Sequence, residues 1–314
     1  EIIKNKLPEI NQEIAKILTN IVDFSIYLEN DDDKLDIMIK HPRFDARPLE
    51  MGSGAEKTLA STAIRLALIS VTTLPIPDIF IMDEPGTALD GENLEGFTKI
   101  LELIKAMPKA RRPVLLHFST DEVYGDIVDG FHTETDLLKP SNPYSATKAA
   151  ADMLVTAWAR TYDVPYVIVR PTNNYGIGQY VEKFIPKAIK NLSLGRPIIM
   201  HDNGSPRRTW LHVSDTANAV IKIIESNIVN ETYNISGNYE EQNIVVAKKL
   251  VDLFFNQTIS HYEEFMDFSE KRIGQDVRYA IDDSKLKALG WKPEAEFNDA
   301  LVDIVEYYKE NFIW

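Results

Sequence analysis

The spacing of apolar residues along the chain alternates between the period of helices and that of strands. Within the first 107 residues it predicts helices over 7–21, 59–70 and 93–107. Two alternating runs, 24–28 and 35–39, predict strands joined by an acidic turn. The helix over 59–70 follows a glycine-containing stretch, so its N-terminus could offer backbone N–H groups to an anion.

From Val114 onward, short apolar runs alternate with longer helical segments. The predicted strands are 114–118, 166–170, 198–200 and 233–235, after an earlier apolar run at 78–82. The predicted helices are 144–162, 184–194, 216–226, 244–255 and 297–311. Ser214 and Asp215 have the chemistry of an N-cap for the helix 216–226. A strand, a helix and a second strand in this order form a βαβ unit, so the pattern predicts an α/β fold with a parallel sheet.

The 314-residue chain has the composition of a soluble globular protein, with 44% hydrophobic and 26% charged residues. Its formal net charge of −14 argues against a surface that binds nucleic acid as a whole. The absence of cysteine excludes disulfides, thiolate metal sites and thiol nucleophiles, and fits a cytoplasmic protein. Prolines interrupt the most apolar window, 66–82, so no membrane span is expected. The chain starts at Glu1 with no visible signal peptide, which suggests a fragment or a processed start.

Candidate chemistry gathers just after the predicted strand 114–118. Thr120, Asp121 and Glu122 follow at the carboxyl end of this strand, where parallel sheets carry functional groups. Tyr144 and Lys148 lie four residues apart in a predicted helix and so face the same side. An ammonium beside a phenol favours phenolate, so Tyr144 is a candidate base, and Thr120 could hydrogen-bond its oxygen. Asp121 and Glu122 remain as an acid/base pair, and the whole set indicates the transfer of protons and a hydride.

Three short motifs follow one another within the first 107 residues. They are the loop with Ser53 and Gly54, the pair Asp83 and Glu84 after an apolar run, and the segment that ends at Asp90. In this order they resemble the signature loop, the Walker B pair and the D-loop of SMC-type ABC ATPase heads, which act in DNA repair. The phosphate-binding G-x-x-x-x-G-K-[ST] loop is absent, so the chain alone is not expected to hold ATP. Nucleic acid is an expected partner only under this alternative.

Longer motifs occupy residues 93–314. They are Ser119–Asp126, Ser141–Asp152, Arg170–Gly176, Glu182–Pro186, Gly274–Tyr279 and Leu289–Pro293. This part resembles the dTDP-glucose 4,6-dehydratases, extended short-chain dehydrogenase/reductases that act on nucleotide sugars. The resemblance implies NAD as the cofactor, a nucleotide-sugar substrate, and a Rossmann-like parallel sheet followed by a smaller C-terminal α/β substrate domain. It also implies a homodimer formed through the helices 144–162 and 184–194.

The resemblance further implies a role for each residue that matches a family motif. Tyr144 would take the proton of the C4 hydroxyl while hydride passes to NAD, and Thr120 would bond the C4 oxygen. The resulting ketone acidifies C5–H, which Glu122 would remove while Asp121 protonates the departing C6 hydroxyl. The residues implied to bind the cofactor are Tyr144, Lys148 and Asn174, and those implied to bind the substrate are Asn173, Lys183, Arg208, Asn243 and Arg278.

Some of these residues also have simpler interpretations. Arg208 and Lys183, each taken singly, could be surface charges, and Asn243 could be the N-cap of the helix that follows it. The scattered histidines show no spacing of metal ligands, so no metal site is expected.

The Rossmann half of such an enzyme is incomplete in this sequence. The G-x-x-G-x-x-G turn, the first three strands and the ribose-binding acid are absent, and the ATPase-like segment stands in their place. We therefore expect an α/β chain with an ABC-ATPase-like segment over 1–107 and a dehydratase-like part over 108–314. In that part, 108–175 would carry the remaining NAD-domain elements and the catalytic residues, and 176–314 mainly the substrate domain. The sequence leaves open an active dehydratase, an ATPase head fragment and a catalytically silent chimera.

Overall fold

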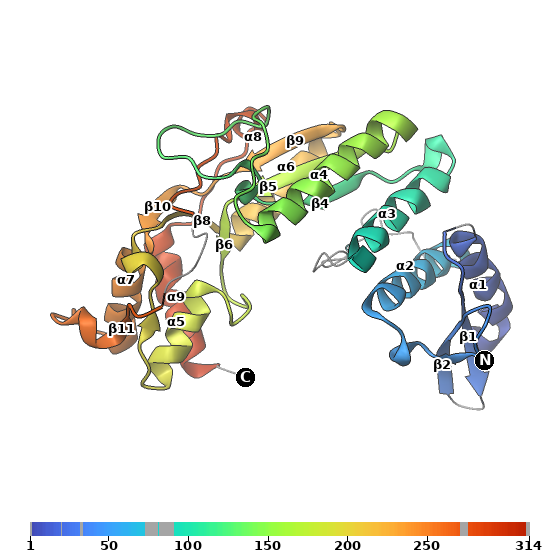
Figure 1. Cartoon of the computed structure of the whole chain (residues 1–314), viewed down its shortest axis with the longest axis horizontal. Coiled ribbons are helices and arrows are strands. Elements are labelled where there is room, and N and C mark those ends of the chain that lie inside the picture. The colour runs from blue at the N-terminus through green and yellow to red at the C-terminus, as the bar shows by residue number, and fades with distance from the viewer. Residues whose placement is uncertain are drawn as a thin grey trace. The chain divides into compact units, whose positions relative to one another are not determined.

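The computed structural model describes residues 2–19, 21–31, 34–72, 81, 91–270 and 276–311 (Figure 1). The chain divides into two compact units, Glu1–Pro113 with Ala157–Val164, and Val114–Thr156 with Pro165–Trp314. No helix in the described part of the chain combines the length and the apolar character needed to cross a membrane.

The N-terminal unit packs long helices on an antiparallel sheet. Its elements are α1 (Ile2–Leu18), β1 (Ser25–Asp31), β2 (Lys34–Lys40), β3 (Arg47–Pro48), η1 (Leu49–Met51), α2 (Gly54–Val71), α3 (Gly91–Ala106) and η2 (Lys109–Arg111). The strands pair in the order β1-β2-β3. Ile14, Ile39 and Ala63 belong to one core and have no exposed surface. Burying a side chain of leucine size contributes about 1.5–3 kcal/mol, so this core holds α1 and α2 to the sheet.

Several element boundaries in this unit differ from the prediction. The strand β1 continues through Asp31, because Asn30 pairs with Leu35 and Asp31 with Lys34 in the hairpin register. The predicted acidic turn is therefore shorter than expected, since backbone pairing does not depend on the polarity of the side chains. The helix α1 ends at Leu18 rather than at residue 21.

The start of α2 also differs from the prediction. The helix begins at Gly54 rather than at residue 59, behind a capping box formed by Ser53 and Glu56. Ser53 Oγ accepts from the Glu56 backbone N–H at 3.3 Å, and Glu56 Oε2 accepts from the Ser53 backbone N–H at 2.6 Å. The carboxylate at this helix N-terminus is therefore the chain's own Glu56, in place of the expected external anion.

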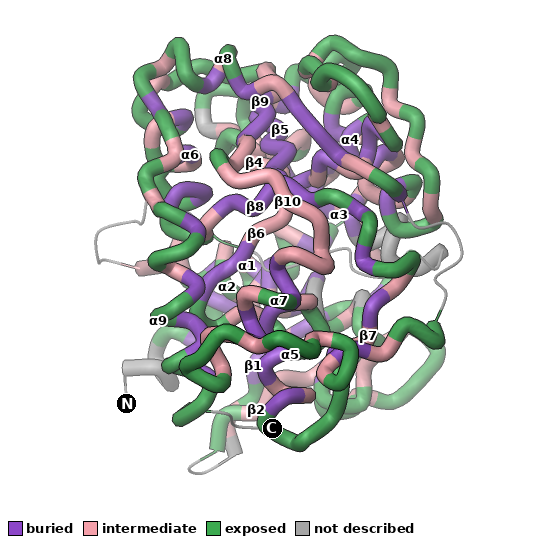
Figure 2. The backbone as a smooth tube through the Cα atoms, turned by 90° about the vertical axis from the view of Figure 1, so that its left-hand side faces the viewer, coloured by how far each residue is buried: buried purple, intermediate pink, exposed green. Residues whose placement is uncertain are grey.

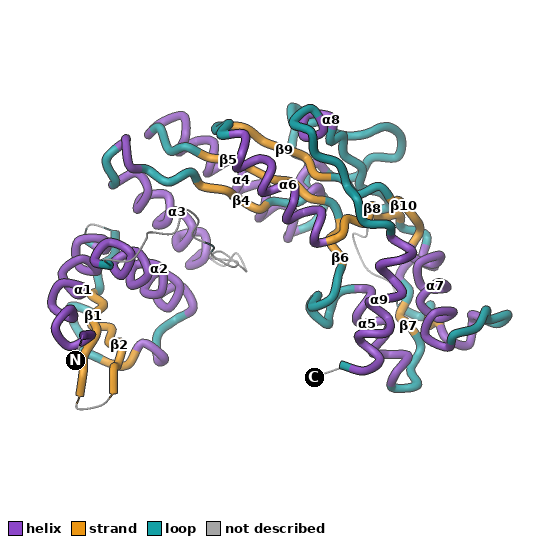
Figure 3. Tube along the Cα trace, turned by 180° about the vertical axis from the view of Figure 1, so that it is seen from behind, coloured by secondary structure: helices purple, strands orange, loops and turns teal. Residues whose placement is uncertain are grey.

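The C-terminal unit contains the predicted parallel sheet. Its strands β4 (Leu115–Phe118), β5 (Tyr166–Pro171) and β9 (Glu231–Ile235) lie in the order β4-β5-β9. The helices α4 (Pro143–Tyr162) and α6 (Val213–Ser226) lie on opposite faces of this sheet (Figures 1 and 3). Because both faces are covered, β5 is buried along nearly its whole length (Figure 2). This arrangement confirms the α/β prediction for this part of the chain.

A second layer of this unit carries the remaining long helices. Its elements are β6 (Asn173–Tyr175), α5 (Phe184–Ser193), β7 (Ile198–Ile199), η4 (His201–Gly204), β8 (Arg207–His212), β10 (Tyr239–Gln242), α7 (Asn243–Phe255), η5 (Tyr262–Phe265), β11 (Met266–Asp267) and α9 (Phe297–Glu310). The short helix α8 (Ser284–Lys287) packs instead beside β9 of the parallel sheet. The strands β10, β8 and β6 form one sheet, and β11 pairs with β7. Tyr175, Trp210 and Phe297 join the core beneath α5, α7 and α9, and each makes ring contacts with the other two.

Two predicted helix caps in this unit are wrong. The helix α6 begins at Val213 with His212 as its N-cap, whereas Asp215 lies inside the helix. The Asp215 carboxylate instead accepts from the backbone N–H groups of Glu294 and Ala295, at 3.0 and 3.1 Å. The helix α7 has Gln242 as its N-cap and Asn243 as its first helical residue.

The predicted strand 78–82 lies outside the described residues, apart from Ile81, whose side chain is exposed. This strand therefore stays a prediction.

Candidate active site

A short helical turn, η3 (Asp121–Tyr124), follows β4 and carries the first group of predicted residues. Thr120 is its N-cap, and its Oγ1 accepts from the Glu122 backbone N–H at 3.3 Å and donates to Asp121 Oδ1 at 3.1 Å. Gly125 ends the turn at a φ of 83°, and a Cβ there would lie 2.3 Å from the Lys139 carbonyl oxygen. The turn thus holds all three polar side chains at the carboxyl end of β4.

Asp121 is buried, with 3% of its surface exposed, and its Oδ2 has no hydrogen-bond partner within the described residues. Burial, and after it the negative charge of Glu122, raise the pKa of this carboxyl from 3.8 to about 7. The hydrogen bond from Thr120 and the charge of Arg208 act in the opposite direction. Asp121 can therefore carry a proton near neutral pH, as a general acid requires.

Asp121→Asn is expected to remove part of the pH dependence of stability. The folded-state pKa of Asp121, about 7, lies above its ordinary value of 3.8, so folding favours the protonated carboxyl. This contribution is fully present below about pH 3.8 and is lost as the pH rises through about 7. The neutral variant should gain melting temperature relative to wild type between about pH 5 and about pH 8. Asp129→Asn, at an exposed position, is the control, and equal pH profiles for both variants would contradict the prediction.

Glu122 is held by side chains from two other parts of the chain. Its Oε2 accepts from Asn142 Nδ2 at 3.3 Å and from the Tyr279 hydroxyl at 3.4 Å. Burial and the charges of Glu122 and Asp276 raise the pKa of Tyr279, so the phenol keeps its proton. These contacts to Glu122 were not predicted, although Asn142 and Tyr279 both lie inside motifs that carry the family resemblance.

Tyr144 and Lys148 lie in the first turns of α4. Lys148 Nζ donates to the Phe118 carbonyl oxygen at 2.8 Å, which places this ammonium at the carboxyl end of β4, beside the η3 turn. Tyr144 is 56% exposed. The spacing of four residues puts both side chains on one face of the helix.

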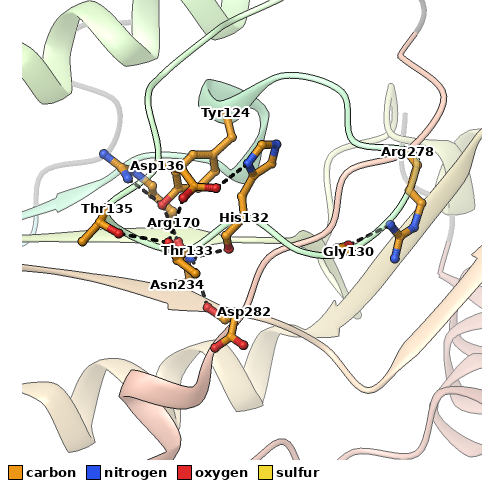
Figure 4. A network of polar contacts seen from close by, with 10 residues as sticks. All are labelled: Tyr124, Gly130, His132, Thr133, Thr135, Asp136, Arg170, Asn234, Arg278 and Asp282. Carbon is orange, nitrogen blue, oxygen red and sulfur yellow. Dashed lines mark hydrogen bonds and ion pairs between the residues drawn. The ribbon is translucent and has the colours of Figure 1, made fainter.

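A buried polar network lies beneath η3 and links it to α4, β5 and β9. Arg170 donates through Nη1 to the Tyr124 hydroxyl at 2.6 Å and through Nε to Asp152 Oδ2 at 3.0 Å. The Tyr124 hydroxyl in turn donates to Asn234 Oδ1 at 2.8 Å. Figure 4 shows Arg170, Tyr124 and Asn234 pointing toward one another. His117, on β4, also reaches this network, with its Nε2 3.3 Å from Asp152 Oδ1.

The predicted cofactor and substrate ligands lie on several elements. Asn173 and Asn174 are in β6, where Asn174 Nδ2 donates to the Thr172 carbonyl oxygen at 3.1 Å and its Oδ1 accepts from the Thr216 hydroxyl. Lys183 is exposed and directly precedes α5. Asn243 is half-buried at the start of α7.

The two predicted arginine ligands are both engaged by the protein. Arg208 is buried, and its guanidinium donates to the carbonyl oxygens of Arg207 and Asp276, at 2.7 and 3.1 Å. Arg278 forms a two-pronged contact with Glu240, through Nε at 2.9 Å and Nη2 at 3.0 Å. Its Nη1 donates to the carbonyl oxygens of Val128 and Gly130. A diphosphate at Arg278 would therefore have to compete with Glu240.

The remaining predicted residues belong to the ATPase-like motifs. Ser53 and Gly54 lie at the start of α2, as described above. Asp83, Glu84 and Asp90 lie outside the described residues. Within the described residues, no group of three or more His, Asp or Glu side chains is arranged to hold a metal ion.

Known proteins are similar to the C-terminal two thirds of the chain. The model of the family described as GDP-mannose 4,6 dehydratase matches residues 82–304. The chain is 40% identical over 234 residues to the dTDP-glucose 4,6-dehydratase of Neisseria gonorrhoeae, a match that covers 70% of the chain and 68% of that protein. It is 43% identical over 193 residues to the low-salt glycan biosynthesis protein Agl12 of Haloferax volcanii, covering 62% of the chain and 61% of that protein. The chain thus spans roughly two thirds or less of each of these curated relatives.

Solved structures show the same similarity. The dTDP-glucose 4,6-dehydratase of Bacillus anthracis, in complex with NAD, superposes with a TM-score of 0.62 and 36% identity, over 69% of this chain and 67% of that one. DesIV, a dTDP-glucose 4,6-dehydratase of Streptomyces venezuelae with NAD bound, superposes with a TM-score of 0.65 and 32% identity, over 70% of this chain and 66% of that one.

Proposed function

The chain belongs to the GDP-mannose 4,6-dehydratase family, and on that premise we propose that it removes water from a nucleotide sugar. The preferred substrate in this proposal is dTDP-glucose, which would become a 4-keto-6-deoxy sugar. One observation carries the proposal above all: adjacent carboxyl groups occupy different environments. Burial raises the pKa of Asp121 to about 7, whereas Glu122 is half-buried and accepts hydrogen bonds. Such a difference suits one acid and one base.

Each residue of the site has a defined task in this proposal. Tyr144 takes the proton of the C4 hydroxyl, the charge of Lys148 favours the phenolate, and Thr120 bonds the C4 oxygen. Glu122 removes the proton at C5, which the neighbouring ketone makes acidic, and Asp121 gives its proton to the C6 oxygen, which leaves as water. When bound, NAD supplies the hydride acceptor and donor of the reaction.

The described residues fit one end of NAD. Tyr144 and Lys148 together offer a hydroxyl and an ammonium for the nicotinamide ribose, and Asn174 lies on β6 as a further polar ligand. The glycine-rich turn that holds the pyrophosphate in Rossmann folds does not occur in the sequence. Cofactor binding is therefore the first property to measure.

The decisive experiment combines binding and turnover. The purified chain is examined for co-purified NAD by mass spectrometry, and its melting temperature is measured with NAD and dTDP-glucose. We expect both ligands to raise the melting temperature, and proton NMR to show a C6 methyl signal as product forms. GDP-mannose in place of dTDP-glucose tests the choice of nucleotide. If neither NAD nor a nucleotide sugar shifts the melting temperature, the proposed activity is wrong.

We further propose that Asn173, Lys183, Arg208, Asn243 and Arg278 contact the substrate. Among these five residues, Arg208 is the best-supported substrate ligand, because a buried guanidinium beside the acid/base pair suits a diphosphate. We also propose a homodimer and a cytoplasmic location, by analogy with the family.

For the N-terminal residues we propose an origin in an SMC-type ABC ATPase head, with boundaries at 1–107 and 108–314. Its support is the order of the three sequence motifs and the placement of Ser53 and Gly54 at a helix start. ATP turnover that is abolished by Glu84→Gln would support an ATPase role, and the absence of ATP binding would remove it.

A further inference from the structure

A second carboxylate lies beside Glu122 and has no task in the proposed reaction. Asp276 is buried, and its Oδ2 accepts from Ser141 Oγ at 2.6 Å, from Asn142 Nδ2 at 3.3 Å and from the Tyr279 hydroxyl. Asn142 Nδ2 and the Tyr279 hydroxyl are also the two donors to Glu122 Oε2. Glu122 and Asp276 therefore share both of these donors.

Besides its contacts with Glu122 and Asp276, Tyr279 is held by Arg208. The guanidinium carbon of Arg208 lies 4.8 Å from the ring centroid, and Arg208 Nη2 donates to the Asp276 carbonyl oxygen at 3.1 Å. Tyr279 is only 4% exposed. A side chain that is buried, stacked and hydrogen-bonded in this way has little freedom to rotate.

A phenol has a single proton to donate, whereas Tyr279 faces two carboxylates. Its contact with Glu122, at 3.4 Å, lies at the long end of the hydrogen-bond range, so the proton is directed mainly to Asp276. Glu122 is thus held in place without being strongly hydrogen-bonded by the phenol.

We propose that Tyr279 and Asp276 are positioning residues that hold Glu122 in the orientation in which it removes the C5 proton. The inference rests on the proposed function of Glu122. Within the described residues, both side-chain hydrogen bonds of Glu122 fall on Oε2, so we assign Oε1 as the oxygen that takes the proton. Among the described residues, the charged groups that interact with this site are Asp121 beside Glu122, Asp276 and Arg208.

The test supplies dTDP-4-keto-6-deoxyglucose directly to the full chain in D₂O, without added NAD. The ketone acidifies C5–H, so Glu122 can exchange that hydrogen for deuterium, and proton NMR follows the loss of the signal. We expect exchange with the wild type and none above background with Glu122→Gln. Tyr279→Phe and Asp276→Asn should slow exchange by about 10-fold at saturating ketone, with the KM unchanged.

A matched pair elsewhere in the same unit serves as the control. The Tyr262 hydroxyl donates to both carboxylate oxygens of Asp252, at 2.9 and 2.8 Å. Tyr262→Phe and Asp252→Asn make the same chemical changes and should leave exchange at the wild-type rate. Circular dichroism confirms folding, and Tyr279→Phe decides the question if Asp276→Asn does not fold.

The outcomes separate this inference from the function on which it rests. Wild-type exchange rates in both Tyr279→Phe and Asp276→Asn, with exchange lost in Glu122→Gln, would overturn the positioning role and leave the proposed function intact. No exchange by the wild type would overturn the assignment of Glu122 as the C5 base, and the positioning role with it. A fall in rate together with a raised KM would indicate lost ketone binding and would also overturn the positioning role.

Discussion

Glu122→Gln is expected to lower the rate of 6-deoxy product formation by about 10²–10⁴-fold, the usual contribution of a general base. Glutamine has nearly the same shape, and its amide oxygen can still accept from Asn142 and Tyr279. It cannot take up the C5 proton. The measurement is the initial rate at which the C6 methyl signal appears in proton NMR, with saturating dTDP-glucose and NAD at neutral pH.

Glu263→Gln is the matched control for this variant, because Glu263 is an exposed residue of η5. It should keep the wild-type rate. If Glu122→Gln formed product within about tenfold of the wild-type rate, Glu122 would contribute too little to be the base. Melting temperatures with and without dTDP-glucose show whether both variants still bind the substrate.

The largest effect on stability is expected for Asp152→Asn, which should lower the free energy of unfolding by about 3–5 kcal/mol. Asp152 is 1% exposed and Arg170 is 5% exposed. Asp152 Oδ2 accepts from Arg170 Nε at 3.0 Å and forms an ion pair with Nη2, also at 3.0 Å. Removing the negative charge leaves the Arg170 cation buried without compensation. Urea denaturation, followed by circular dichroism, measures the change.

Glu231→Gln, which removes one partner of an exposed ion pair, is the control for Asp152→Asn. Glu231 pairs with Lys285 at 2.6 Å, but the two side chains are 43% and 35% exposed, so its loss should cost about 0–1 kcal/mol. The double variant Asp152→Asn, Arg170→Met should recover part of the loss, because no unpaired charge then remains buried. A single Asp152→Asn variant no less stable than Glu231→Gln would contradict this account of the network.

The elements of the C-terminal unit were largely predictable because their apolar periods are clear. The helix predicted over 144–162 is α4, from Pro143 to Tyr162, and the strand predicted over 166–170 is β5, from Tyr166 to Pro171. The helix caps were less predictable. Ser214 and Asp215 have the chemistry of a cap, yet Asp215 serves the distant backbone of Glu294 and Ala295. A local pattern cannot indicate a partner so far along the chain.

The same limit applies to the candidate site. Thr120, Asp121 and Glu122 could be placed at the end of β4 because they follow it directly in the sequence. The contact between Tyr279 and Glu122 joins residues 157 positions apart, and nothing in the sequence pairs them. Arg278 illustrates the same limit in another way. Its position in a family motif predicts a contact with the substrate, but the sequence does not reveal that its guanidinium is hydrogen-bonded to Glu240.

The parallel sheet has a consequence for the order in which the protein folds. The Tyr124 hydroxyl bonds to Asn234 on β9, across 110 positions of sequence. Contacts of such range form slowly, because the intervening loop must close before any stabilisation is gained. During synthesis, Thr120, Glu122, Tyr144 and Lys148 all precede β9, so they leave the ribosome before the strand that completes the network beneath them. We therefore expect the site to mature late, after the third strand has docked.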